Sequence, residues 1–300
     1  MSSFEAPDSA SPEGRPLAMY RNQDVTISWS QRGEAQTTPL RNLDGDLLFF
    51  VHEGGGELMT DYGPLGYEKG DFVYVPKAVT HQFFPSTPSQ MLVIEPATPL
   101  DLFDIDAAGR HAPFDPSVLA IPEPCPREES GPGEYVVTYK LRGDYPTATL
   151  RHDPFDVVGW KGDLFPFKLA FDDLMPVHSE RAHLAPTIGG LFQAEGMVVT
   201  NLIPQPSVAD LDAEELPSYH RNIDYDEFWL IHRAGGPVDG GGQLIYTPQG
   251  FVHGATEELR SMHQAARKSD DRRELAAIGI EAWRALTPTP EYLASIEPSS

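Results

Sequence analysis

Three residues in the last third of the chain have types and spacing that suit a metal ion. His220 and Glu227 lie in YHRNIDYDEFW (219–229), and His253 ends the segment GGGQLIYTPQGFVH (240–253). Two imidazoles and one carboxylate form the ligand set that holds iron(II) on one face of an octahedron. The open positions take a substrate and dioxygen together, so the sequence predicts an iron(II)-dependent oxidation at this site.

Taken singly, these residues have ordinary structural explanations. A lone histidine such as His253 is common in a turn, and a lone carboxylate such as Glu227 is usually exposed to solvent. The three residues together, at this spacing in a β-rich chain, favour metal binding over the separate explanations.

The elements that must position these residues are predicted to be strands. Short apolar runs such as GDFVYVP (70–76), MLVIEP (91–96) and EFWLIH (227–232) alternate with turns rich in Gly and Pro. This texture is typical of a β-sandwich or β-barrel. Helix-like sequence is scarce before 256–285, where the polar first half predicts a helix and LAAIGIEAW (275–283) could instead form a closing strand. We therefore predict an all-β fold with minor helices.

A weak internal repeat indicates two barrels in one chain. The segments GDFVYVPKAVTH (70–81) and GQLIYTPQGFVH (242–253) each read as a strand, a turn and then a histidine at the start of the next strand. Upstream of His81 the sequence offers no second histidine and no carboxylate at a suitable spacing. His81 is therefore predicted to be a structural histidine in a barrel without metal.

We predict three segments along the chain. Residues 1–15 form a flexible leader, residues 16–120 an N-terminal barrel without metal, and residues 121–300 a C-terminal barrel with the metal site. The stretch around 100–133, which contains PCPREESGPG, is the predicted connection between the two barrels.

Composition limits the partners and the compartment. Acidic residues outnumber basic ones by 45 to 22, which gives a formal charge of −23. Such a surface repels phosphate groups, so neither nucleic acid nor an anionic membrane is an expected partner. The N-terminus carries no secretory signal, and the single cysteine, Cys125, excludes an internal disulfide. These features predict a cytoplasmic protein.

The spacing of these residues resembles the cupin family. The second half of the cupin pattern, G-x5-P-x-G-x2-H, is matched at every position: Gly242, Pro248, Gly250 and His253. The first half is matched by His220 and Glu227, with Asn222 in place of a further histidine. The resemblance implies double-stranded β-helix (jelly-roll) barrels and three protein ligands rather than four.

Three segments are similar, more specifically, to the homogentisate 1,2-dioxygenase family: residues 133–169, SYHRNIDYDEF (218–228) and GGGQLIYTPQGFVHG (240–254). This resemblance implies a bicupin whose C-terminal barrel binds Fe(2+) through His220, Glu227 and His253. It also implies an oxidoreductase of aromatic compound metabolism that cleaves the ring of a dihydroxylated or amino-hydroxylated aromatic acid with O2. The family usually assembles as a trimer or a dimer of trimers, so a homo-oligomer is expected.

Two positions depart from the pattern of this family. Lys161 stands where the family has its acid–base histidine, and Thr247 stands where it has a second histidine near the metal. The resemblance implies a catalytic role for Lys161, although a lysine beside a turn is also common on a surface. The residues predicted to contact the substrate are Asn222, Arg221, His183 and Thr247. The exact aromatic substrate stays open: homogentisate, or a related hydroquinone, aminophenol or hydroxylated aromatic acid.

Two other functions are also compatible with this sequence. One is a non-oxidative, metal-dependent cupin isomerase or epimerase, in which Lys161 would carry a proton. The other is a degenerate cupin that only binds a ligand or a partner.

Overall fold

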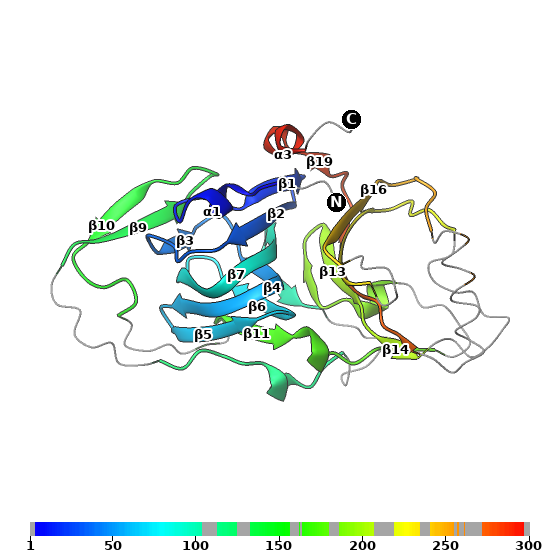
Figure 1. The fold of residues 1–300 in the computed structure, drawn as a ribbon, viewed down its shortest axis with the longest axis horizontal. Coiled ribbons are helices and arrows are strands. Elements are labelled where there is room, and N and C mark those ends of the chain that lie inside the picture. Colours follow the sequence, from blue (N-terminus) through cyan, green and yellow to red (C-terminus); the bar gives the residue numbers. More distant parts are fainter. Residues whose placement is uncertain are drawn as a thin grey trace. The chain divides into compact units, whose positions relative to one another are not determined.

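The computed structural model describes residues 4–103, 113–124, 133–156, 162, 164–179, 186–206, 219–234, 241–254, 257, 261 and 272–296. Strands dominate this part of the chain (Figure 1). Short helices accompany them: α1 (Pro7–Ala10), α3 (Pro290–Ser295) and the 3-10 turns η1 (Pro116–Val118), η2 (Phe171–Asp173) and η3 (Pro186–Gly189). The fold is therefore all-β with minor helices, as the sequence predicted.

The chain forms two compact units. Unit 1 comprises residues 1–99, 116–173 and 287–300, and unit 2 comprises residues 100–115 and 174–286. The domain boundary between residues 120 and 121 stays a prediction. Two segments after it, residues 135–140 and 167–170, form strands that pair with strands of unit 1. Among the described residues, no helix has the length and apolar character needed to cross a membrane.

Unit 1 is a jelly roll built on two long strands, β4 (Leu47–Thr60) and β7 (Thr80–Pro96), which pair with each other along most of their length. The remaining strands are β1 (Leu17–Arg21), β2 (Val25–Arg32), β3 (Leu40–Asn42), β5 (Gly63–Glu68), β6 (Asp71–Val75), β9 (Tyr135–Lys140), β10 (Thr147–Leu150), β11 (Phe167–Ala170) and β19 (Thr287–Pro288). The first part of β4 pairs with β6, and its second part pairs with β5. The strand β7 likewise pairs with further strands, β2 and β3.

Glycines allow β4 to bend between these two parts. The register between β4 and β7 shifts between Val51 and Gly56, as expected for β-bulges. Gly54 has φ of +85°, and a Cβ atom there would lie 2.2 Å from the carbonyl oxygen of Pro88. Only glycine fits this position, because a side chain would collide with the neighbouring strand.

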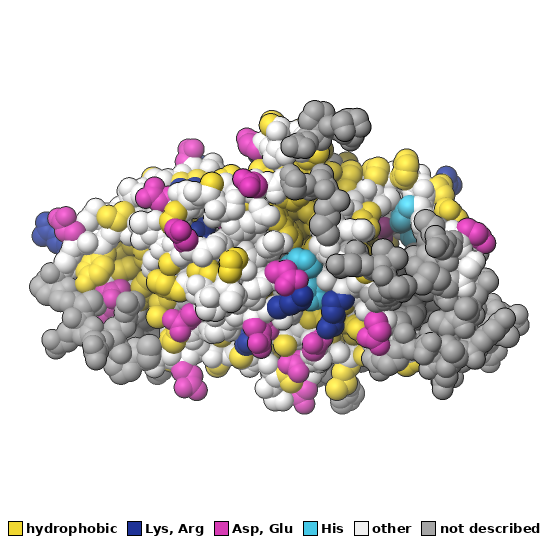
Figure 2. All heavy atoms as spheres, viewed as in Figure 1, with side chains coloured by type: hydrophobic (Ala, Val, Ile, Leu, Met, Phe, Trp, Pro, Cys, Tyr) yellow, Lys and Arg dark blue, Asp and Glu magenta, His cyan; other side chains and the backbone are white. Residues whose placement is uncertain are grey.

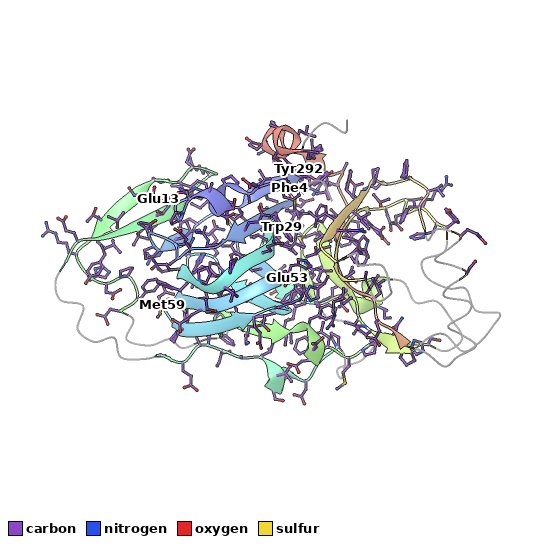
Figure 3. The ribbon with its side chains drawn as sticks, viewed as in Figure 1. Phe4, Glu13, Trp29, Glu53, Met59 and Tyr292 are labelled. Carbon is purple, nitrogen blue, oxygen red and sulfur yellow. The ribbon has the colours of Figure 1, made fainter. Side chains whose placement is uncertain are left out.

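The interior of unit 1 is filled by apolar side chains. Inward-facing residues of β4 to β7 form one buried cluster: Leu47, Phe49, Val51, Leu58, Leu65, Tyr67, Val73, Val75, Val79, Phe83, Met91 and Val93. Outside this cluster, Phe4 packs edge-on against Tyr292 of α3, with ring centroids 5.6 Å apart (Figure 3). Thr289 fixes the start of α3, since its backbone N–H donates to the Met19 carbonyl.

Unit 2 is built around a six-stranded antiparallel sheet with the order β16-β15-β18-β13-β12-β8. These strands are β8 (Asp101–Leu102), β12 (Phe192–Ala194), β13 (Met197–Leu202), β15 (Asp226–Arg233), β16 (Gln243–Thr247) and β18 (Ala276–Ala282). A further pair joins β14 (Gln205–Pro206) to β17 (Arg272–Arg273).

Strand β18 settles an alternative that the sequence left open. LAAIGIEAW contains this strand, and every residue of β18 is buried between β15 and β13. A strand buried on both faces needs no alternation of polar and apolar residues, so its sequence lacks a clear period. Gly279 leaves room for the Trp229 ring, which would lie 2.7 Å from a Cβ atom there. The helix predicted in the polar part of 256–285 lies largely outside the described residues.

Acidic side chains are prominent on the surface. They are scattered over the face shown in Figure 2 and outnumber the basic side chains among the described residues there. This distribution agrees with the formal charge of −23.

Candidate metal centre

The two histidines of the predicted site are cross-strand neighbours in unit 2. His220 and His253 form an antiparallel bridge in which each backbone N–H donates to the other residue's carbonyl, both at 2.9 Å. Directly opposed residues project their side chains to the same face. Accordingly, the two imidazole rings lie with their centroids 4.2 Å apart.

The carboxylate of the site comes from the neighbouring strand. Glu227 is the second residue of β15 and is only 3% exposed. Its Oε2 atom lies 2.9 Å from Nε2 of His253. One ligand atom from each of His220, Glu227 and His253 lies within 4.8 Å of the others. Two imidazoles and one carboxylate from two separate segments of the chain therefore lie close together.

A tight turn orients His253. Gly250 has φ of +76°, and its N–H donates to the Asn222 carbonyl at 2.6 Å. After this turn, the Nδ1 atom of His253 lies 3.0 Å from the Phe251 carbonyl oxygen. A carbonyl can only accept, so a protonated Nδ1 would donate to it, which leaves Nε2 as the nitrogen that could bind a metal beside Glu227. The Gly of the G-x2-H pattern thus has a local structural cause.

Asp226 fastens this turn to β15. Its Oδ1 atom accepts the N–H of Gln249 at 2.9 Å, and its Oδ2 atom accepts the Tyr246 hydroxyl at 2.7 Å and the Leu286 N–H at 2.8 Å. The carboxylate is buried. Sequence reasoning missed this residue, because a carboxylate before Glu227 in YDEFW gives no sign of its distant partners.

The donor atoms fit a divalent transition metal. Adjacent ligand atoms around a metal with bonds of about 2.1 Å lie about 3 Å apart. The separation between Nε2 of His253 and Oε2 of Glu227 is 2.9 Å, and the donor set is the one preferred by iron(II). Without a cation, the same contact is a hydrogen bond or an ion pair between the two side chains.

Carboxyl groups lie close together around the ligands. Glu281 of β18 stands opposite Glu227 in the sheet, and burial raises the pKa of its carboxyl to about 8. The charges of Glu227 and Asp224 act in the same direction. Burial also raises the pKa of Tyr225, and Glu281 and Glu227 add to that shift. A bound cation would offset this concentration of carboxylates.

The other predicted site residues are distributed as follows. Thr247 is buried and stands opposite Glu227 on β16. Asn222 is half-buried, and its Nδ2 atom is buried without a hydrogen-bond partner among the described residues. Arg221 is exposed. Lys161 and His183 lie outside the described residues. The functional roles of all five residues stay predictions.

Several large apolar side chains close to the two histidines in the chain are exposed. Residues that flank the two histidines in the chain expose large hydrophobic groups: Tyr219, Ile223, Phe251 and Val252. They are neighbours of His220 and His253 in the sequence, and each exposes apolar surface to solvent.

Comparison with known proteins gives the family. A family model described as "Homogentisate 1,2-dioxygenase N-terminal" matches residues 19–171. A relative from Saccharolobus solfataricus is 28% identical over 217 residues, which cover 70% of this chain and 56% of the relative. Homogentisate 1,2-dioxygenase of Caenorhabditis elegans is 26% identical over 238 residues, 74% of this chain and 54% of that protein. The chain thus spans about half the length of the curated relatives that it matches.

Among solved structures, a cupin 2 conserved barrel domain protein from Leptotrichia buccalis aligns over 89% of each chain, with a TM-score of 0.40 and 9% identity. The all-β architecture in two units agrees with the predicted bicupin fold class. The family model covers none of His220, Glu227 and His253, so their assignment as ligands rests on geometry and spacing. Because the family model matches half of the length of this chain, the chain belongs to the homogentisate 1,2-dioxygenase family.

Proposed function

We propose that this protein is an Fe(2+)-dependent dioxygenase that cleaves the ring of a dihydroxylated or amino-hydroxylated aromatic acid with O2. The observation that carries the proposal is the meeting of His220, Glu227 and His253 within 4.8 Å, in a chain of a dioxygenase family. The three side chains would hold the metal and leave its remaining positions open.

When bound, the metal would act as a Lewis acid and would bring the substrate oxygen and O2 together on one ion. The protein's own residues position the ligands for this metal. The Phe251 carbonyl fixes the His253 ring, Asp226 holds the turn before it, and buried Glu227 contributes one negative charge. The exposed apolar side chains next to the two histidines in the chain, among them Phe251 and Val252, would contact the aromatic ring.

Further roles in this proposal come from the resemblance to the family. Lys161 is the proposed acid–base residue, which would accept the proton of the ring hydroxyl at Nζ if its surroundings lower the pKa of the ammonium group. The proposed substrate contacts are Asn222, Arg221, His183 and Thr247. A homo-oligomer, trimer or hexamer, in the cytoplasm belongs to the same proposal.

Oxygen uptake by iron-loaded protein tests the proposal. Protein reconstituted with Fe(2+) without air would be mixed with homogentisate, gentisate, hydroquinone or an aminophenol acid in an oxygen electrode. We expect uptake of one O2 per substrate consumed, together with a new ultraviolet band from the opened ring. Iron-loaded protein that consumes no oxygen with any of these substrates would overturn the proposal. Turnover without O2 would favour an isomerase or epimerase instead.

A pair of histidine variants provides the metal control. His253→Gln removes one proposed ligand, whereas His152→Gln changes an exposed histidine of unit 1. Iron content after dialysis should fall by at least about tenfold in His253→Gln and stay at one per chain in His152→Gln. Equal loss of iron from both variants, or no stoichiometric iron in the wild type, would favour a cupin that only binds a ligand.

A further inference from the structure

Glu281 is a buried carboxylate beside the proposed metal ligands, and it has no assigned role. It is 1% exposed, and its Oε1 atom has no hydrogen-bond partner among the described residues. In the sheet it stands between Glu227 on one side and Val198 on the other. Opposed residues project to one face with Cβ atoms about 5 Å apart, so Glu281 shares the face of Glu227.

Asn222 contributes an unpaired donor in the same region. Its Nδ2 atom is buried without a partner among the described residues, and it lies two residues after His220. A buried donor or acceptor without a partner is unfavourable, so two of them in one region are available to bind a polar group of a ligand.

Unit 1 has an asparagine and a glutamate at the corresponding positions, Asn42 and Glu95, and there the two side chains are hydrogen-bonded to each other. Asn42 accepts the N–H of Ala78 with its carbonyl, as Asn222 does from Gly250. The Nδ2 atom of Asn42 donates to Oε1 of Glu95 at 3.0 Å. The two glutamates also have corresponding places in their strands. Ile94, which precedes Glu95, pairs with Leu48 near the start of β4. Ile280, which precedes Glu281, pairs with Phe228 near the start of β15.

The second oxygen of Glu95 is also occupied, because Lys140 donates to it. In unit 1 the repeated asparagine and glutamate therefore satisfy each other and a lysine. In unit 2 the corresponding Nδ2 and Oε1 atoms have no partners among the described residues. They lie in the region of His220 and Glu227, which stand where unit 1 has Leu40 and Leu47.

We propose that Nδ2 of Asn222 and Oε1 of Glu281 together hold a second hydroxyl or amino group of the substrate, beside the oxygen that binds the metal. Such a group both donates and accepts, so it satisfies an amide N–H and a carboxylate oxygen at once. This inference rests on the proposed function, and it adds Glu281 as a substrate-binding residue that selects rings with two donor groups.

Ligand binding without turnover tests this inference. Affinities of iron(II)-loaded protein for four phenols would be measured by calorimetry in the absence of O2: catechol against 2-methoxyphenol, and hydroquinone against 4-methoxyphenol. In each pair a methyl group replaces the hydrogen that Glu281 would accept. In the wild type the hydroxyl member should bind more tightly, and Glu281→Gln should reduce that preference about tenfold for at least one pair.

Two variants keep the test specific. Glu95→Gln changes the corresponding carboxylate of unit 1 and should leave both preferences unchanged. Should Glu281→Gln fail to fold, Glu281→Asp withdraws the carboxylate by one methylene and should reduce the same preference. Unchanged preferences for both pairs in a folded, iron-loaded Glu281 variant would overturn the inference. Failure of the wild type to bind iron or any phenol would instead sink the proposed function.

Discussion

The two units present a histidine in nearly the same way, but among the described residues only unit 2 places the other proposed metal ligands beside it. His81 and His253 each direct Nδ1 at the carbonyl oxygen two residues earlier, at 3.2 Å and 3.0 Å. Opposite His81 on β3 stands Leu40, whereas opposite His253 stands His220. The turn therefore presents the histidine, and the facing strand decides whether it can join a metal site.

The supporting contacts repeat as well. Asp46 accepts the Lys77 N–H at 2.7 Å and the Tyr74 hydroxyl at 3.2 Å. Asp226 makes the matching contacts with Gln249 and Tyr246. The residue after this aspartate is Leu47 in unit 1, where it joins the apolar cluster, and Glu227 in unit 2. One scaffold thus serves as a filled core in one unit and as a polar site in the other.

The largest effect is expected from making unit 2 resemble unit 1. Glu227→Leu introduces a leucine after Asp226, as unit 1 has Leu47 after Asp46. The substitution also removes the only carboxylate of the proposed ligand set. Iron affinity, measured by competition with a chelator, should fall by at least about a hundredfold, because two imidazoles alone hold the ion weakly. Glu57→Gln, at an exposed position of unit 1, is the control. Unchanged iron affinity in Glu227→Leu would break the comparison.

The buried histidine of unit 1 should govern part of the acid sensitivity. Burial lowers the pKa of His81 from 6.5 to about 4. The unfolded chain therefore binds more protons between these values, and the free energy of unfolding falls as the pH falls through this window. The effect is about 3 kcal/mol.

His81→Gln removes this titration. Denaturant unfolding of metal-free protein at pH 7 and pH 4 should show a loss smaller by about 3 kcal/mol in this variant than in the wild type. Iron binding should not change. An identical pH dependence in both proteins would mean that His81 is not held neutral by burial.

The two aspartates offer the sharpest matched pair. Asp46→Asn and Asp226→Asn each weaken buried, charge-assisted hydrogen bonds, so each should lower the free energy of unfolding by about 2 kcal/mol. Only Asp226→Asn should also lower iron affinity, by about tenfold, since it loosens the turn that carries His253. If both variants or neither variant lost iron, Asp226 would have no special connection to the site.

The smallest effect concerns the turns themselves. Gly250 has φ of +76° and Ala78, at the matching place in unit 1, has φ of +67°. Gly250→Ala should therefore destabilise the protein by about 1 kcal/mol, and Ala78→Gly should stabilise it by a similar amount. Thermal unfolding of the two variants measures both changes. Shifts in the same direction would contradict equivalent turns.

Sequence patterns predicted the features that depend on neighbours along the chain. The alternation of apolar runs and turns indicated an all-β fold, and the G-x5-P-x-G-x2-H pattern with His220 and Glu227 indicated the ligand set. The same pattern suggested the repeat at His81. These are local signals, because turn geometry and strand pattern follow from short stretches of residues.

Other features depend on pairing between distant strands and left no local trace. Glu281 lies in an apolar segment, and only the register between β15 and β18 brings it opposite Glu227. The hydrogen bonds of Asp226 reach residues in β16 and beyond β18. Strand register is set by the whole sheet, so neither residue could be singled out from sequence alone.

The most direct measurement is anomalous diffraction at the iron absorption edge from crystals of iron-loaded protein. The account predicts one strong peak about 2.1 Å from Nε2 of His253, a carboxylate oxygen of Glu227 and a ring nitrogen of His220. A peak elsewhere in the chain, or iron-loaded crystals with no peak among these three side chains, would contradict it.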